Sequence, residues 1–307
     1  MNRIKTMRIT GLMITLLLFL VVIATGCNHS YQYQGKAKIL ISPGPFSFPM
    51  MEARFLFLVD YLTKETGWKF DKVSAPTSEA AFLKMVKTEK FDVAIVNPYL
   101  YLLLEKEKGA IPILKTVSFD GRDTYRGMII TRKDSPIKSL NELRGKQILA
   151  PSRSTVGGFI SQWILLKEQG LDPDRDVTYR YGITQEEIME KIVTGRAEVG
   201  FIREDVYEAM KKANGHAPKV KVLAYTHYLP NPAVVVFPDT NPELREKVKS
   251  ALLKLRFDNP NHRFILERIR ILGFSPAESA DYQSFKALLT GYGFLPPDLN
   301  YFPSSSS

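Results

Sequence analysis

The stretch Ala150-Pro-Ser-Arg-Ser-Thr-Val-Gly-Gly-Phe159 lies between a short apolar run at 147–150 and an apolar-periodic segment at 160–169. The run favours a β-strand and the periodic segment favours a helix. This part of the chain is therefore predicted to be strand, loop and helix. Ser154 or Thr155 is expected in the helix-capping position.

A loop of this kind can hold an anion. The first N–H groups of a helix have no partner within it, and the helix dipole adds a partial positive charge there. Gly157 and Gly158 let a ligand approach the backbone, and the hydroxyls of Ser152, Ser154 and Thr155 can each donate a hydrogen bond to an oxyanion. At this point an alternative stays open, because Ser-Thr before a helix can be only a cap and Gly-Gly only a loop.

Strand-like and helix-like segments alternate on both sides of this stretch. The predicted strands are 38–42, 70–74, 91–96, 124–132, 177–181, 197–202, 220–225 and 233–237, and the predicted helices are 50–66, 77–87, 135–145, 185–194, 242–257, 263–272 and 282–289. A further helix is predicted to start at Asn97-Pro98, where the strand 91–96 ends. Alternation predicts parallel sheets with helices on their faces, and ligands of such sheets sit beyond the carboxyl ends of the strands. Loops 43–49 and 97–101 therefore join 150–158 as candidate walls of a site.

The N-terminal part has the pattern of an export signal. Lys5 and Arg8 precede an uncharged run at 9–26, and Cys27 follows at once. We interpret 1–26 as a signal peptide. Ala24-Thr25-Gly26-Cys27 resembles a bacterial lipobox, in which the cysteine becomes lipid-modified. A retained single-pass anchor is the alternative, although the run is short for a bilayer. On either interpretation the body lies in the periplasm or on the extracellular face, attached to the membrane.

Composition excludes several kinds of site. Cys27 is the single cysteine, so no internal disulfide and no cysteine nucleophile can form. The four histidines have no metal-ligand spacing, and no Gly-x-Ser-x-Gly or P-loop motif is present, so we expect no metal, no cofactor and no enzyme activity.

The net charge of +10 could suggest nucleic acid. An exported lipoprotein does not meet nucleic acid, however, and the lysines are interleaved with acidic residues, as in solvated helix faces. We expect no nucleic-acid partner. A basic balance can still help to collect a small anion by long-range attraction.

Several motifs in a fixed order resemble those of the phosphate-, phosphite- and phosphonate-binding proteins of ABC importers, a branch of the type 2 periplasmic binding proteins. They are Phe91-Asp-Val-Ala with Asn97-Pro98-x-x-Tyr101, Gly121-Arg122-x-x-Tyr125-Arg126, the segment 134–146, Ser154-Thr155-Val-Gly157, and Pro230-Asn231-Pro232. The resemblance covers about 38–290.

This resemblance implies an α/β fold with two lobes, each a mostly parallel sheet flanked by helices, joined by two hinge strands and closing on its ligand. The implied divisions are a tether at 27–35, a first lobe made of 36–127 and 226–300, a second lobe at 128–225, and a disordered tail at 301–307.

The resemblance also implies a set of ligand-binding residues. Ser154, Thr155 and the backbone of Val156 and Gly157 would hold the oxyanion from the second lobe, together with Ser152. Tyr101 would contact it from the first lobe. Weaker candidates are Asn97, Tyr125, Phe46 (or Phe48), and Thr184, which stands where the family has a histidine.

Arg203 departs from the family pattern. At the end of a strand facing a cleft, a guanidinium could pair bidentately with an oxyanion. The alternative is a surface ion pair with Glu204 or Asp205.

The function we expect is a monomeric, lipid-anchored binding protein that delivers a small oxyanion to an ABC permease. The alternative keeps the fold but makes the protein a solute sensor or accessory protein that presents its ligand state to a membrane kinase or redox partner.

Overall fold

The computed structural model describes residues 33–42, 48–71, 76, 79–214 and 219–295. The described residues from Gly35 onward belong to one compact unit, Gly35–Ser307. The expected signal peptide, Cys27, Phe46 and the expected tail lie outside the described residues.

The first sheet has the strand order β14-β5-β13-β4-β2. Its strands are β2 (Ile39–Ile41), β4 (Val93–Val96), β5 (Ile111–Val117), β13 (Ala233–Val236) and β14 (Gly273–Pro276). Every residue of β2, β4 and β13 is buried, which fits their uninterrupted apolar sequences. β1 (Gly35–Ala37) and β3 (Trp68–Phe70) pair parallel with each other as a separate two-stranded sheet. This small sheet lies next to the helix Phe48–Thr66.

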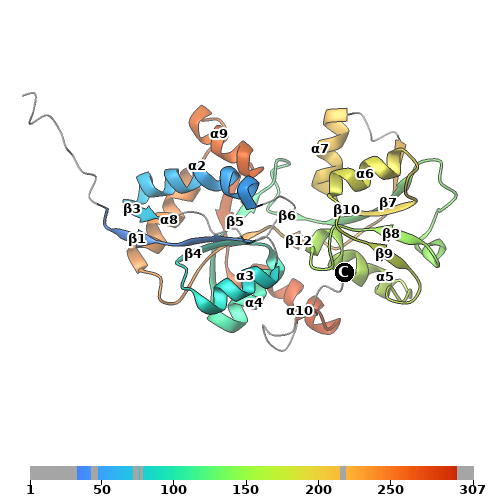
Figure 1. The fold of residues 1–307 in the computed structure, drawn as a ribbon, viewed down its shortest axis with the longest axis horizontal. Coiled ribbons are helices and arrows are strands. Elements are labelled where there is room, and N and C mark those ends of the chain that lie inside the picture. Colours follow the sequence, from blue (N-terminus) through green and yellow to red (C-terminus); the bar gives the residue numbers. More distant parts are fainter. Residues whose placement is uncertain (1–32, 43–47, 72–75, 77–78, 215–218, 296–307) are drawn as a thin grey trace, which may run out of the picture. The chain divides into compact units, whose positions relative to one another are not determined.

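Helices cover both faces of the first sheet (Figure 1). On one face, α2 (Phe48–Thr66), α8 (Pro242–Lys254) and α9 (Pro260–Ile269) share a core with Ile39 and Ile41. On the other, α3 (Glu79–Thr88) and α4 (Pro98–Lys108) share a core with Leu40. The split follows from the period of two in a strand, which sends successive side chains to opposite faces.

The second sheet has the strand order β11-β7-β10-β8-β9. Its strands are β7 (Gly127–Arg132), β8 (Gln147–Leu149), β9 (Thr178–Arg180), β10 (Val199–Arg203) and β11 (Val220–Tyr225). One face packs on α6 (Gln185–Val193) and α7 (Glu204–Asn214), and the other on α5 (Ile160–Glu168). A short 3-10 helix, η1 (Leu140–Leu143), replaces the helix expected at 135–145.

Two short strands lie between the sheets in the chain: β6 (Thr124–Tyr125) leads into β7, and β12 (Leu229–Pro230) leads into β13. They pair antiparallel with each other. Next to them the fully buried Asn231 donates from Nδ2 to the carbonyls of Thr116 at 2.9 Å and Arg122 at 3.0 Å. These bonds fix the point at which the chain returns to the first sheet.

The two-lobed α/β class predicted from the sequence is confirmed, but the expectation of mostly parallel sheets is wrong. β13 pairs antiparallel with both β4 and β5, and β7 pairs antiparallel with both β10 and β11. Parallel pairs remain between β2 and β4 and among β8, β9 and β10. The reason is that β7 and β13, the strands that follow β6 and β12 in the chain, each lie inside their sheet and run antiparallel to both neighbouring strands.

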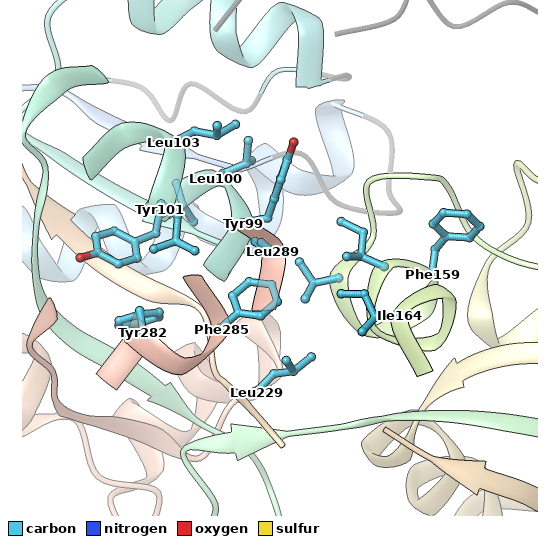
Figure 2. Close-up of a cluster of buried hydrophobic side chains, with 14 of the residues drawn as sticks. Tyr99, Leu100, Tyr101, Leu103, Phe159, Ile164, Leu229, Tyr282, Phe285 and Leu289 are labelled. Carbon is cyan, nitrogen blue, oxygen red and sulfur yellow. The ribbon is translucent and has the colours of Figure 1, made fainter. Parts of the chain in front are cut away.

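The C-terminal helix α10 (Gln283–Gly291) belongs to an apolar cluster that contains residues of both sheets' helices. Figure 2 shows Phe285 and Leu289 of α10 between α4 and the α5 side chain of Ile164. Just beyond α10, the ring of Phe294 meets Trp163 of α5 edge to face, with centroids 5.0 Å apart. Among the described residues, no helix combines the length and the apolarity that a bilayer crossing requires.

Candidate functional site

Three hydroxyl groups gather at the turn that follows β8. The Oγ of Ser152 lies 2.7 Å from the Oγ1 of Thr155 and 3.1 Å from the Oγ of Ser154. Each hydroxyl carries one proton and two lone pairs. Two mutual bonds occupy two of the three protons, so one O–H remains available to an acceptor, and the others can be redirected.

The local conformation differs from the prediction. Ser154 or Thr155 was expected to cap the following helix, but α5 begins only at Ile160, after a 3-10 turn at Val156–Gly158. Thr155 precedes that turn without a side-chain capping bond. The hydroxyls are therefore not consumed by capping. The N–H groups of Val156 and Gly157, as the first of the turn, have no partner within it.

Gly157 lies against two candidate ligand-binding residues, Tyr125 and Arg203, from distant parts of the chain. A Cβ built on Gly157 would lie 2.5 Å from Cε2 of Tyr125 and 3.0 Å from Cγ of Arg203. The Arg203 guanidinium in turn lies over the Tyr125 ring, 4.1 Å from its centroid. β6, the turn and the end of β10 thus meet at one point, and only glycine allows this approach.

The guanidinium of Arg203 forms an ion pair with the carboxylate of Asp205. Its Nε and Nη2 donate to the two carboxylate oxygens at 2.9 and 2.8 Å, and its backbone N–H donates to Oε1 of Gln185 at 2.6 Å. With 24% of the Arg203 side chain exposed, this is a partly buried pair. Burial is the largest single effect and lowers the pKa of Arg203, but the charge and hydrogen bonds of Asp205, together with smaller effects of Tyr125 and Asp120, outweigh it, so the pKa lies above its ordinary value.

Tyr125 is 4% exposed, and burial raises the pKa of its hydroxyl, with the nearby Arg203 charge acting in the opposite direction. The phenol therefore stays protonated and remains a hydrogen-bond donor throughout the physiological range.

Tyr101 does not lie with these residues. Its side chain is 0% exposed, its hydroxyl bonds to Oε1 of Glu105 at 2.5 Å and Oγ of Ser279 at 3.2 Å, and its ring meets Tyr282 at 4.5 Å. Figure 2 shows it on the α10 side of α4. Burial raises the pKa of Tyr101. The helix phase thus turns the Tyr101 hydroxyl into a buried network with Glu105 and Ser279, and the expected ligand contact by Tyr101 stays a prediction.

Two other candidates serve as helix caps. Oδ1 of Asn97 accepts from the Leu100 amide at 2.9 Å and begins α4. Thr184 begins α6 in a reciprocal capping box with Glu187. The bonds from the Thr184 backbone and hydroxyl lower the pKa of Glu187. The structure therefore makes Asn97 and Thr184 helix caps. Thr184 stands between Gly182, whose amide donates to the Pro151 carbonyl at 3.0 Å, and Gln185, which accepts from the Arg203 amide, and its ligand contact stays a prediction.

The sequence interpretation missed Ser161 and Gln162, two polar residues at the start of α5 that contact the turn's carbonyls. A signal was available, since both stand in an otherwise apolar segment. Across the described residues, no group of three or more histidine, cysteine, aspartate or glutamate side chains is arranged to hold a metal ion.

Comparison with known proteins gives one family and several similar folds. Residues 46–282 match the family model described as ABC transporter, phosphonate, periplasmic substrate-binding protein. PhnD1 from Prochlorococcus marinus, solved with methylphosphonate, superposes with a TM-score of 0.72 at 15% identity, covering 85% of this chain and 99% of that chain.

Two further solved structures are similar. The binding protein component of an ABC phosphonate transporter from Pseudomonas aeruginosa gives a TM-score of 0.68 at 15% identity, over 83% of this chain and 85% of that one. A Xanthomonas citri protein bound to chloride ion gives 0.69 at 18% identity, over 83% and 96%. At these identities the likeness to the solved structures shows a shared fold.

Proposed function

The chain belongs to the family of periplasmic substrate-binding proteins of ABC phosphonate transporters, and on this premise we propose that its 152–158 turn binds a small oxyanion. Phosphate, phosphite or a phosphonate is the proposed ligand class. The bound anion is delivered to an ABC permease. Family membership favours this role over that of a sensor for a kinase or redox partner.

The observation that carries the proposal is the hydroxyl group cluster of Ser152, Ser154 and Thr155 beside the leading amides of a 3-10 turn. Hydroxyl and amide donors suit an anion, because an oxyanion can accept from the one remaining hydroxyl proton and from the two leading amides that have no partner within the turn. Because the hydroxyls are free of capping bonds, their protons can turn toward a ligand.

Arg203 and Tyr125 are proposed to complete the site. Arg203 already shares its charge with Asp205, so the pair brings little net charge to the anion. Its guanidinium retains Nη1 as a further donor, and the protonated Tyr125 hydroxyl is another. We therefore propose that binding relies mainly on directed hydrogen bonds rather than on an unpaired cation.

The division into lobes is proposed to follow the sheets, with 36–127 and 226–300 in the first and 128–225 in the second. The strand membership of the two sheets supports these limits. Closure about β6 and β12 would bring the first lobe to the anion. Lipid attachment at Cys27 is proposed from the sequence, and a Cys27→Ala variant should leave the membrane fraction.

The test is isothermal titration calorimetry on the purified full-length chain with methylphosphonate, phosphite, phosphate and sulfate. We expect one-site binding of at least one phosphorus oxyanion. Thr155→Val should weaken it about 5- to 30-fold, because a lost donor at a desolvated anion costs about 1–2 kcal/mol.

Thr178→Val, the same substitution at an exposed position of β9, is the matched control and should bind as the wild type does. If no anion gives heat or a thermal shift, or if both threonine variants bind equally well, the proposed site is refuted.

A further inference from the structure

Two buried polar residues open helix α5, where apolar residues would be expected. Ser161 is 4% exposed and Gln162 is 0% exposed. Both side chains turn back to the 152–158 turn. Three successive turn carbonyls are each held from five positions later: Thr155 O by the Ile160 amide at 3.1 Å, Val156 O by Ser161 Oγ at 2.9 Å, and Gly157 O by Gln162 Nε2 at 2.8 Å.

A hydrogen bond that holds the carbonyl of one residue also fixes the direction of the next residue's N–H group. The peptide unit is planar, and in its trans form the C=O of one residue points opposite to the N–H of the next. The bonds to Thr155 O and Val156 O therefore direct the N–H groups of Val156 and Gly157 away from α5. These are the two amides that the turn itself leaves without partners.

Gln162 extends the arrangement to the neighbouring strands. Its Nε2 also lies 3.1 Å from the carbonyl of Ile202, next to Arg203 in β10, and 3.4 Å from that of Met128 in β7. The absence of a side chain at Gly127 makes room for it: a Cβ there would lie 2.7 Å from Cδ of Gln162 and closer still to Nε2.

We propose that Ser161 and Gln162 are positioning residues that preorganise the anion turn, by holding its carbonyls on the α5 side so that its amides face the ligand. This rests on the proposed function of the turn. Neither side chain needs to touch the anion. A carbonyl released from Ser161 or Gln162 could rotate toward the anion and repel it, whereas a held carbonyl cannot.

The experiment compares Ser161→Ala, Gln162→Met and Gly127→Ala with Thr131→Val in the full-length protein. Gly127→Ala leaves α5 unchanged and displaces the Gln162 amide from the other side. Thr131 of β7 provides the matched control, because this residue is equally buried and its hydroxyl donates to a carbonyl, that of Glu198, at 2.6 Å, just before β10. We measure the affinity for methylphosphonate and for phosphate, the midpoint of thermal unfolding, and the 15N amide signals of Val156 and Gly157.

We expect each of the three variants to weaken anion binding about 5- to 30-fold, the factor for one lost hydrogen bond of a buried network. Thr131→Val should lower the thermal midpoint similarly and leave affinity unchanged. Gly127→Ala added to Gln162→Met should give no further loss, because both act through the same amide.

The amide signals separate this inference from the proposed function. If the wild type binds an anion but Ser161→Ala and Gln162→Met bind as well as it does, the positioning role is refuted and the site stands. If the wild type binds none, the proposed function fails, and the ligand-free spectra still decide the inference. Val156 and Gly157 amide signals that are unchanged in the variants would overturn it, and so would equal affinity losses in Thr131→Val.

Discussion

Gly157→Ala should damage both stability and binding, because the turn approaches Tyr125 too closely for any side chain. The new Cβ would lie 2.5 Å from Cε2 of Tyr125, whereas favourable carbon contacts begin at about 3.5 Å, so the ring must move by about 1 Å. The ring cannot move freely, since it is buried beneath the Arg203 guanidinium. Overpacking of this kind costs about 1–3 kcal/mol in the free energy of unfolding.

The assay is urea unfolding followed by circular dichroism, with methylphosphonate titration on the same samples. Tyr125→Leu removes Cε2, so the double variant should lose less stability than the sum of the two single variants, by about 1–2 kcal/mol. Gly291→Ala is the control, because its Cβ would meet nothing within 4 Å and should change stability by no more than about 1 kcal/mol, in the stabilising direction. Additive losses, or a Gly157→Ala effect no larger than that of Gly291→Ala, would refute the packing argument.

Three further outcomes are expected. Thr184→Ala should lower the free energy of unfolding by about 1 kcal/mol through its lost cap while leaving anion affinity unchanged in calorimetry; a large affinity loss would instead place Thr184 at the ligand. Burial raises the pKa of Glu105, but bonds from Lys286 and Tyr101 outweigh it and hold the pKa below the ordinary 4.5. The contribution of Glu105 to the free energy of unfolding is therefore fully present above about pH 4.5 and is lost as the pH falls through the lowered pKa. In Glu105→Gln, the free energy of unfolding should fall less steeply as the pH decreases. An equally steep fall would count against the pairing. Arg203→Lys should weaken methylphosphonate binding about 5-fold or more, because the single nitrogen of lysine cannot form the planar two-nitrogen contact with the carboxylate and also present a separate nitrogen to the anion. Unchanged affinity would remove Arg203 from the proposed site.

Local sequence signals predicted the chain's course well where the determining contacts are local. Asn97-Pro98 marked the start of α4, and the structure has Asn97 as its cap and Pro98 as its first residue. Thr184 and Glu187 also have the spacing of a capping box. The expectation of a ligand role for Thr184 came from its place in the family pattern, and the local signal pointed to the cap that the structure has.

Other features depend on contacts between distant residues. All residues from Pro98 to Leu104 are buried, so the apolar pattern could not tell which tyrosine of α4 turns toward α10. The delayed start of α5 depends on Ser161 and Gln162 binding back to the turn, and on Gln162 reaching strands that lie far away in the chain. Alternating strands and helices likewise could not show that β7 and β13 enter their sheets in the antiparallel direction.

The contact between Trp163 and Phe294 has a practical consequence for shortened versions of the protein. The family model ends at residue 282, yet Phe294 also accepts a hydrogen bond from the Tyr99 hydroxyl through its backbone carbonyl at 3.1 Å. A chain trimmed to the family boundary would uncover one of the two tryptophans and strip α4 of a partner. Fragments for crystallisation or biosensing should therefore extend to at least Leu295, and the fluorescence of Trp163 would report at once when they do not.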